Sequence, residues 1–195
     1  MNLNNIYPLL KTPFPLTVFL LWSLHFIKFT SYCMINSGDD SMNLIIVPYT
    51  IEHAKIISTW KYEPPYDVYN FPSYEYMVEH NSSFLDVDSL TYHSIINDDN
   101  ELIAVCNLSE EEDQVFFGIS VNPIYCWMGL SKTILPMLIE HADKLYHKPL
   151  YLQVRMWNER AIKAYRNVGF KFIAKGLLKT ETGPALFYIM KRPSD

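Results

Sequence analysis

Two short stretches of this 195-residue chain combine residue types that could bind an anion and hold a polar side chain beside it. In the first, Gly129 lies in a turn between an apolar segment and a helical pattern. Backbone N–H groups at such a junction of strand, turn and helix are unpaired, and the positive end of the helix dipole points to the same place. The turn around Gly129 is therefore a candidate binding site for a pyrophosphate group.

The second stretch, residues 158–170, predicts one short capped helix. Asn158 is a favoured N-cap because its side-chain oxygen can accept a hydrogen bond from an N–H group of the first turn. Gly169 can end the helix, since glycine adopts the left-handed conformation without a Cβ clash. Ile162 and Tyr165 share one helical face, so the tyrosine is predicted to point inward.

The pattern Asn-x-x-Ala-x-x-x-Tyr-x-x-x-Gly-Phe in this stretch, directly after a predicted strand, resembles the C-terminal half of the GNAT superfamily of acyl-CoA-dependent N-acetyltransferases. The resemblance extends over about residues 42–192 and implies direct transfer of an acetyl group from acetyl-CoA to an amine. It implies two catalytic residues: Asn158, in contact with the cofactor, and Tyr165, beside the thioester sulfur.

The glycine turn of the family usually reads Arg/Gln-x-x-Gly-x-Gly/Ala and binds the pyrophosphate of coenzyme A. In this chain it matches residues 126–131, where Cys126 and Trp127 depart from the pattern and Ser131 is small enough to replace the second glycine. The resemblance also implies that the backbone of residues 119–121 holds the pantetheine arm and offers an N–H to the oxyanion. The implied acetyl-CoA contacts are Ile119, Ser120, Val121, Met128, Gly129, Leu130, Ser131, Lys132, Asn158 and Tyr165.

Acid strength favours a hydrogen bond from Tyr165 to the sulfur over full proton transfer. Proton transfer from a tyrosine of pKa about 10 to a thiolate of pKa about 8.5 is uphill by about 2 kcal/mol. A hydrogen bond to the developing thiolate avoids this cost. The competing interpretation is a core tyrosine whose hydroxyl has no part in the reaction.

Residues 60–71 are rich in aromatics and contain two prolines, which predict a loop. The loop could be a lid packed on the core, a wall of the acceptor site, or both. Its predicted contacts with the acceptor are Glu63, Tyr66, Tyr69 and Asn70.

The general base is left open by the sequence. Gln153 stands where the branch of the family that acetylates protein N-termini often has a glutamate, and a glutamine side chain cannot usefully accept a proton. Glu63 and Asp67 are candidates on the aromatic loop. A proton relayed by water, or an acceptor amine that arrives neutral, would serve equally well.

The composition favours one globular domain, because 49% of the residues are hydrophobic and 15% are aromatic. A net charge of -5 argues against nucleic-acid binding. Residues 150–192 nevertheless carry nine Lys and Arg against two Glu, which indicates either a site for an anionic ligand or a solvated basic face. The three cysteines and six histidines lack disulfide or metal-ligand spacing, so we expect a reducing compartment, the cytoplasm, and no metal.

Residues 1–41 differ in character from the rest. The apolar run of residues 15–27 is shorter than the roughly 20 residues that a membrane helix needs. Three interpretations compete: a weak membrane anchor, a buried or amphipathic extra segment, and a translated leader upstream of a true start at Met42. The last is preferred, because residues 37–41 read as a linker and the globular pattern begins directly after Met42.

From Met42 onward, the predicted order of elements is β-α-α-β-β-β-α-β-α-β-β, which is the order of the GNAT fold. This predicts an α+β protein with three α/β/α layers around a central mixed, mostly antiparallel sheet, in a domain of residues 42–195. Strands are expected at residues 44–47, 90–96, 101–108, 114–121, 150–155, 170–175 and 185–190, and helices after Thr50, Ser73, Ser131 and Asn158. Pro136 predicts a bend or a shifted start in the third helix.

The sequence thus predicts a cytoplasmic N-acetyltransferase that uses acetyl-CoA and a primary amine of a small molecule or peptide. The first alternative is a non-catalytic module that binds acyl-CoA or a peptide. The second is a membrane-tethered interaction protein, which depends on retention of residues 15–27. No nucleic-acid partner is expected, and a homodimer is left open.

Overall fold

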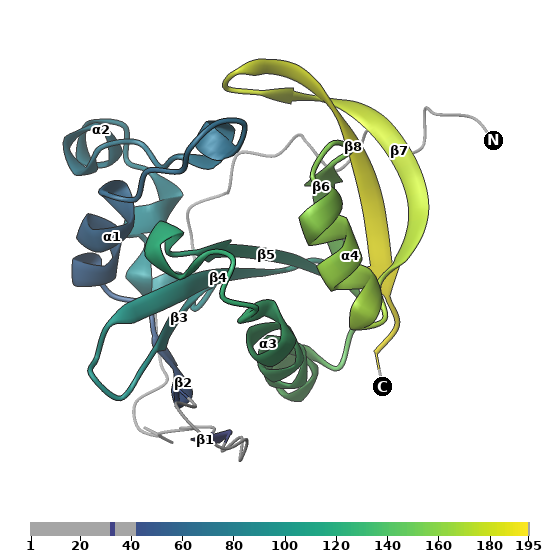
Figure 1. Ribbon diagram of the computed structural model, residues 1–195, viewed down its shortest axis with the longest axis horizontal. Helices are drawn as coiled ribbons and strands as arrows, with labels where there is room; N and C mark the ends of the chain where they lie inside the picture. The colour runs from purple at the N-terminus through teal and green to yellow at the C-terminus, as the bar shows by residue number, and fades with distance from the viewer. Residues whose placement is uncertain (1–31, 34–41, 195) are drawn as a thin grey trace.

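The computed structural model describes residues 32–33 and 42–194, whose helices and strands are labelled in Figure 1. The strands are β1 (Tyr32–Cys33), β2 (Leu44–Pro48), β3 (Tyr92–Ile96), β4 (Leu102–Glu110), β5 (Val115–Val121), β6 (Leu150–Arg155), β7 (Lys171–Thr180) and β8 (Gly183–Arg192). The α-helices are α1 (Ile51–Ser58), α2 (Tyr74–Glu79), α3 (Ser131–Tyr146) and α4 (Glu159–Asn167). Short 3-10 helices are η3 (Tyr66–Tyr69), η4 (Ser83–Leu85), η5 (Val87–Ser89) and η6 (Pro123–Tyr125). From residue 42 onward, the order of strands and α-helices is the predicted one.

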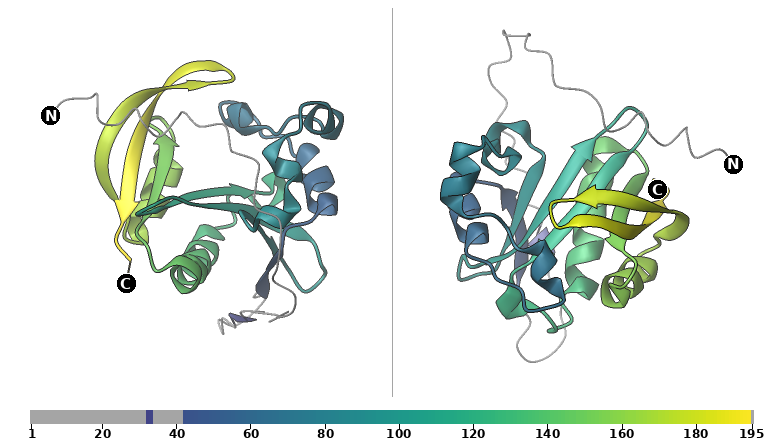
Figure 2. Two further views of the ribbon diagram at one scale, coloured as in Figure 1. Left: turned by 180° about the vertical axis from the view of Figure 1, so that it is seen from behind. Right: turned by 90° about the horizontal axis from the view of Figure 1, so that it is seen from above.

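The helices cover a single sheet whose strands are ordered β1-β2-β3-β4-β5-β6-β8-β7. Buried residues of α1 and α2 pack with Leu102 and Val105 of β4 in one core cluster. Residues of α3, among them Ile134 and Leu138, pack in a second cluster with several strands, and α4 lies against this cluster. The views of Figures 1 and 2 show α1 and α2 on one side of the sheet's centre and α3 and α4 on the other. The predicted α+β class with a layered GNAT-like architecture is confirmed.

One strand pair sets the shape of the sheet around the site. All neighbouring strands are antiparallel except β5 and β6, whose parallel pairing is limited to Val115 with Leu150 and Phe116 with Tyr151. Beyond Phe116 the two strands diverge, whereas β5 stays paired with β4 as far as Val121. The last five residues of β5 therefore have one edge that no described strand covers, as the resemblance implied.

The predicted N-cap residue is the observed one at three of the four α-helices. Thr50, Ser73 and Asn158 each accept a backbone hydrogen bond from the first turn of their helix, as predicted. At α3 the expectation was less accurate: Ser131 is the first helical residue, and Leu130 holds the cap position without a side-chain hydrogen bond. Helix α3 continues through Pro136, because only one backbone hydrogen bond is lost there while both flanking turns are anchored in the core.

The last two strands are longer than predicted. The first was predicted to end at residue 175 and the second to begin at residue 185, because Gly176 and Pro184 are weak strand formers. In the structure β7 and β8 pair with each other from Lys171 to Thr180, well beyond the end of β6. Cross-strand pairing overrides the weak local propensity here, and the hairpin extends past the rest of the sheet (Figure 1).

Residues 1–31 and 34–41 lie outside the described part of the chain, so the three interpretations of this segment stay predictions. Tyr32–Cys33 pairs with Leu44 and Ile45, which adds a short strand before the predicted domain start. Within residues 32–33 and 42–194, no helix has the length and apolar character needed to cross a bilayer.

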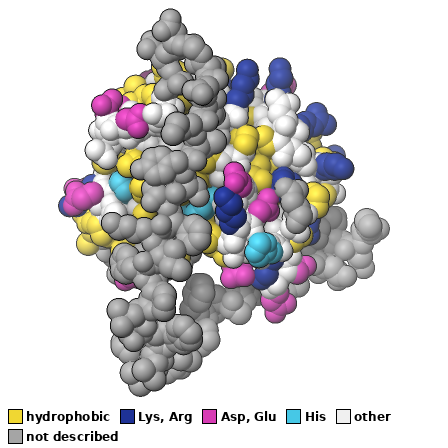
Figure 3. Space-filling view, turned by 90° about the horizontal axis from the view of Figure 1, so that it is seen from below, with side chains coloured by type: hydrophobic (Ala, Val, Ile, Leu, Met, Phe, Trp, Pro, Cys, Tyr) yellow, Lys and Arg dark blue, Asp and Glu magenta, His cyan; other side chains and the backbone are white. Residues whose placement is uncertain are grey.

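The basic surplus of residues 150–192 lies largely at the surface. Lys163 and Arg166 of α4 and Lys171, Lys175 and Lys179 of β7 are all exposed. Figure 3 shows most of the visible Lys and Arg side chains gathered toward one side of the face seen from below. None of these five side chains lines the cavity described in the next section, which favours the solvated basic face over a site for an anionic ligand.

Candidate active site

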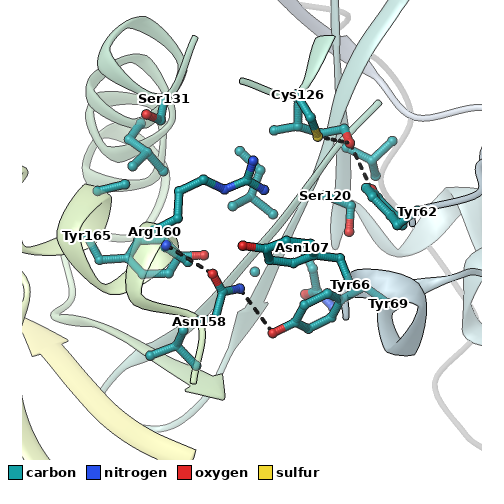
Figure 4. A pocket seen from close by; sticks show the side chains of 18 of the residues that line it. Tyr62, Tyr66, Tyr69, Asn107, Ser120, Cys126, Ser131, Asn158, Arg160 and Tyr165 are labelled. Atoms are coloured by element: carbon teal, nitrogen blue, oxygen red, sulfur yellow. Dashed lines mark hydrogen bonds between the residues drawn. The ribbon is translucent and has the colours of Figure 1, made fainter. Parts of the chain in front are cut away.

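A cavity of about 580 Å³ lies where the free edge of β5 faces the first turns of α3 and α4 and the aromatic loop. The predicted site residues among its lining are Tyr66, Tyr69, Ile119, Ser120, Val121, Gly129, Leu130, Ser131, Asn158 and Tyr165. Four others do not line it: Glu63, Asn70, Met128 and Lys132. Residues distant in sequence are thus brought to one site, and Figure 4 shows many of their side chains directed into it.

The first turn of α3 offers a row of unpaired backbone donors. None of the N–H groups from Trp127 to Ser131 donates a hydrogen bond to another described residue. Pairing resumes at Lys132, whose N–H donates to the oxygen of Gly129 at 3.1 Å. Gly129 has a φ of +76°, and a Cβ placed there would have no atom within 4 Å, so the turn is open on that side. Convergent N–H groups at a helix N-terminus fit a diphosphate.

Trp127 shapes this turn in a way the sequence did not reveal. Its φ is +74°, a left-handed conformation that is rare for an aromatic residue and costs about 1 to 2 kcal/mol. Its side chain is 74% exposed, and the Arg160 guanidinium lies over the indole at 4.2 Å from the ring centroid. The same guanidinium lies 4.9 Å from the centroid of Tyr66. Arg160 thus joins α3, α4 and the aromatic loop through two cation–π contacts.

Asn158 is nearly buried, at 7% exposure, and both ends of its amide are engaged. The Oδ1 atom accepts a hydrogen bond from the N–H of Ala161 at 3.1 Å, which caps α4. The Nδ2 atom donates to the hydroxyl of Tyr69 at 3.1 Å (Figure 4). Burial raises the pKa of Tyr69, although the bond from Asn158 opposes this effect. The structure therefore gives Asn158 two structural contacts, and its predicted contact with acetyl-CoA stays a prediction.

Tyr165 is on α4 and lines the cavity. Its ring packs edge-on against Phe170, with centroids 5.8 Å apart. Burial raises the pKa of the Tyr165 hydroxyl, so it is an even weaker acid than a free tyrosine. This hydroxyl has no hydrogen-bond partner among the described residues, which leaves it free to donate to a ligand.

The end of β5 is fixed by a residue of the aromatic loop. The hydroxyl of Tyr62 donates to the carbonyl oxygen of Val121 at 2.8 Å, and the Tyr62 N–H donates to Oδ1 of Asn70 at 2.7 Å. Asn70 therefore orders the loop from outside the cavity lining, and its contact with the acceptor stays a prediction. Sequence analysis missed Tyr62 and Arg160, because both act through partners that are far away in the chain.

The cavity lining is poor in side chains that could accept a proton. No Asp, Glu or His is found among its described lining residues, and Arg160 is the only charged one. Gln153 lines the cavity, whereas the two candidate bases of the loop, Glu63 and Asp67, are exposed and do not line it. The described site thus contains hydrogen-bond donors for a developing negative charge but offers no side-chain base.

The sequence that forms this site matches a known family. The model of the acetyltransferase (GNAT) family matches residues 54–170, which run from α1 to the end of the Gly-Phe motif. The chain belongs to the GNAT family. Among curated relatives, the Escherichia coli K12 and Shigella flexneri [ribosomal protein bS18]-alanine N-acetyltransferases are each 36% identical to this GNAT chain over 59 residues. That match covers 30% of the chain and only 40% of the length of each relative.

Solved structures resemble this GNAT chain over a greater length. A chimera of the Vibrio cholerae spermidine N-acetyltransferase SpeG and hSSAT superposes with a TM-score of 0.61 at 14% identity, covering 77% of this chain and 95% of the other. The Escherichia coli ribosomal-protein-S18-alanine N-acetyltransferase gives 0.57 at 22% identity, covering 78% and 94%. At these identities the likeness shows a shared fold.

Proposed function

We propose that this GNAT protein is an N-acetyltransferase that moves an acetyl group from acetyl-CoA directly to a primary amine of a small molecule or peptide. One observation carries the proposal: Gly129, Leu130 and Ser131, whose N–H groups are unpaired among the described residues, line the same cavity as the free edge of β5 and Tyr165. A diphosphate site, an extended slot and a donor for a leaving sulfur are the parts that this reaction requires.

Binding of acetyl-CoA would use the backbone more than side chains. The N–H groups of residues 127–131 would hold the diphosphate. The uncovered edge of β5 at residues 119–121 would pair with the amides of the pantetheine arm, apart from the Val121 carbonyl oxygen, which already accepts from Tyr62. Acetyl-CoA supplies the acetyl group as a reactive thioester. Because most of these contacts are backbone contacts, the departures at Cys126 and Trp127 from the usual family pattern leave them intact.

In the proposed reaction the neutral amine nitrogen attacks the carbonyl carbon of the thioester, and the carbon–sulfur bond breaks. The nitrogen loses one proton and the sulfur gains one, so the products are the N-acetyl amide and free coenzyme A. An N–H of the β5 edge stabilises the negative charge on the carbonyl oxygen. The Tyr165 hydroxyl hydrogen-bonds the sulfur as it becomes a thiolate, since its raised pKa disfavours full proton transfer.

The second candidate is a module that binds acyl-CoA or a peptide without turnover. Two observations favour it: Cys126 and Trp127 replace the usual residues of the turn, and the described lining holds no side-chain base. The cytoplasmic location and the homodimer remain predictions, because no described feature of the chain bears on them.

Release of free coenzyme A decides between the two candidates. The purified full-length chain is incubated with acetyl-CoA and a panel of primary amines, and thiol is measured over time with a thiol reagent. We expect release above the background hydrolysis with at least one amine, together with thermal stabilisation by acetyl-CoA alone. Stabilisation without release would favour the binding module, and neither stabilisation nor heat of binding at millimolar acetyl-CoA would reject both candidates.

A further inference from the structure

One wall of the cavity is formed by aromatic rings of the loop and its neighbours. Tyr66 and Tyr69 come from η3, and their rings lie 5.5 Å and 5.9 Å from that of Trp157, centroid to centroid. Phe71 and Phe84, which also line the cavity, pack edge-on with their centroids 5.2 Å apart. Figure 4 shows Tyr69 joined to Asn158 by a hydrogen bond, and the Arg160 guanidinium lies 4.9 Å from the ring centroid of Tyr66. An acceptor that enters here meets ring faces and edges, so an apolar or aromatic body suits this wall.

The charges next to this wall are positive. The Arg160 guanidinium lies over Tyr66, and the Arg155 guanidinium lies 6.0 Å from the ring centroid of Tyr69. Arg155 is 8% exposed, and its hydrogen bonds go to the hydroxyls of Thr180 and Thr182. Neither arginine forms a salt bridge with a described carboxylate. A second ammonium group on the acceptor would therefore meet repulsion, with no lining carboxylate to bind it.

The absence of a lining base places a further demand on the acceptor, which must reach the thioester without its proton. An α-amino group has a pKa of about 7.7 to 8.0, whereas a lysine-type amine has a pKa of about 10.4. At pH 7.5 roughly a third of the former is neutral, against about one part in 800 of the latter. The neutral fraction alone favours the α-amino group by more than about a hundredfold.

We propose that the acceptor is a monoamine that enters as the free base, on an apolar or aromatic body and without a second positive charge. An α-amino group on an apolar or aromatic residue is the kind of compound that meets all three conditions. This inference rests on the proposed acetyl transfer and deepens it. Polyamines and lysine side chains are accordingly poor acceptors.

A matched set of acceptors tests this directly. Coenzyme A release is measured with a short neutral peptide that begins with Phe, with the same peptide beginning with Lys, and with spermidine. We expect kcat/KM to be highest for the Phe peptide, at least about tenfold lower for the Lys peptide, and at least about a hundredfold lower for spermidine. Equal or faster release with spermidine would overturn the inference and leave acetyl transfer standing. Release with none of these three, but with an amine of another kind, would overturn it as well.

The pH profile separates an acceptor that arrives neutral from one that the protein deprotonates. Without a protein base, kcat/KM rises with pH and levels off at the pKa of the acceptor, so the midpoint moves when the acceptor is changed. A series of peptides whose α-amino pKa values are first measured by titration provides the comparison. A midpoint that stays fixed across the series would reveal a protein base and overturn the inference.

A variant that adds a carboxylate to the cavity lining should gain activity toward spermidine. Gln153→Glu places a carboxylate in the cavity lining, where it can both accept a proton and attract a second ammonium. We expect the ratio of kcat/KM for spermidine to that for the Phe peptide to rise at least about fivefold. Asn167→Asp adds the same charge at the end of α4, outside the cavity, and should leave the ratio unchanged. An unchanged ratio in a folded Gln153→Glu protein that still binds acetyl-CoA would contradict the electrostatic part of the inference.

Discussion

Two helix N-termini meet at the cavity, and they are built in opposite ways. Helix α4 begins with a side-chain cap, since Asn158 accepts the N–H of Ala161, and its amide also reaches Tyr69. Helix α3 begins at Leu130 and Ser131 without any side-chain cap, after a row of unpaired N–H groups. The first turn of α4 is capped by a side chain of the protein, whereas the unpaired N–H groups of α3 belong to a turn that lines the cavity.

The difference indicates a division of labour. Unpaired backbone donors are unfavourable unless water or a ligand satisfies them, so an uncapped terminus that lines a cavity is suited to binding. A capped terminus needs no ligand, and α4 can therefore hold Tyr165 in place before acetyl-CoA arrives. The contrast supports the proposal that α3 binds acetyl-CoA and α4 positions Tyr165.

The largest expected effect concerns the group that α4 positions. Tyr165→Phe removes the hydroxyl and keeps the ring that packs on Phe170, so the fold should be retained. We expect kcat to fall about a hundredfold, or roughly 2.7 kcal/mol of barrier, with acetyl-CoA affinity changed less than about threefold. Steady-state kinetics and calorimetry measure the two quantities. A fall in kcat of less than about threefold would make Tyr165 a core tyrosine and α4 a scaffold only.

The next effect tests the binding role of α3. Ser131→Asp places a negative charge in the first turn, where the helix dipole favours it by about 0.3 to 1 kcal/mol but a bound diphosphate is repelled. We expect the melting temperature of the free protein to stay equal or rise, and the Kd for acetyl-CoA to increase at least about tenfold. Ser131→Asn, which is similar in size and neutral, is the matched control and should bind within about threefold of the wild type. Unchanged binding by the Asp variant would place the diphosphate elsewhere.

The sequence was sufficient for α4 and insufficient for most of the cavity. The cap at Asn158, the stop at Gly169 and the inward direction of Tyr165 are local features, fixed by residue type and helical spacing within a dozen residues. The family resemblance also anticipated the free edge of β5. In contrast, Arg160 packs on the rings of Tyr66 and Trp127, which lie far away in the sequence. The sequence of α4 alone therefore could not predict these contacts.

The aromatic loop is a second region whose side-chain contacts the sequence predicted only in part. Its composition predicted that the rings must be covered, and the structure shows Tyr66 and Tyr69 in the cavity wall, as proposed for the acceptor site. Which polar residues of the loop turn inward could not be predicted, since the direction of a side chain on an irregular segment depends on the tertiary contacts. Glu63 and Asn70 therefore fall outside the lining, and Tyr62, which holds Val121, was missed.

The cap of α4 should have a measurable effect on stability. Asn158→Ala removes the acceptor for the Ala161 N–H and the donor to Tyr69, and we expect the free energy of unfolding to fall by about 1 kcal/mol, within a range of about 0.5 to 2. Asn158→Asp keeps a capping oxygen and should stay within about 0.5 kcal/mol of the wild type. Urea denaturation gives both values. Equal stability of the Ala and Asp variants would show that α4 is no better capped than α3.

The smallest effect concerns the backbone of the uncapped turn. Trp127 has a φ of +74°, which any residue with a Cβ adopts at a cost and glycine adopts freely. Trp127→Ala and Trp127→Gly both remove the ring that Arg160 covers, so the difference between them isolates the backbone term. The Gly variant avoids a left-handed cost of about 1 to 2 kcal/mol but loses about 0.4 to 1 kcal/mol more conformational entropy on folding, so we expect it to be more stable than the Ala variant by about 0.5 to 1 kcal/mol in urea denaturation. An Ala variant as stable as the Gly variant would mean that the turn relaxes once the ring is gone. The left-handed backbone would then depend on the stacking of Trp127 against Arg160, and the open row of donors at α3 would depend on α4 after all.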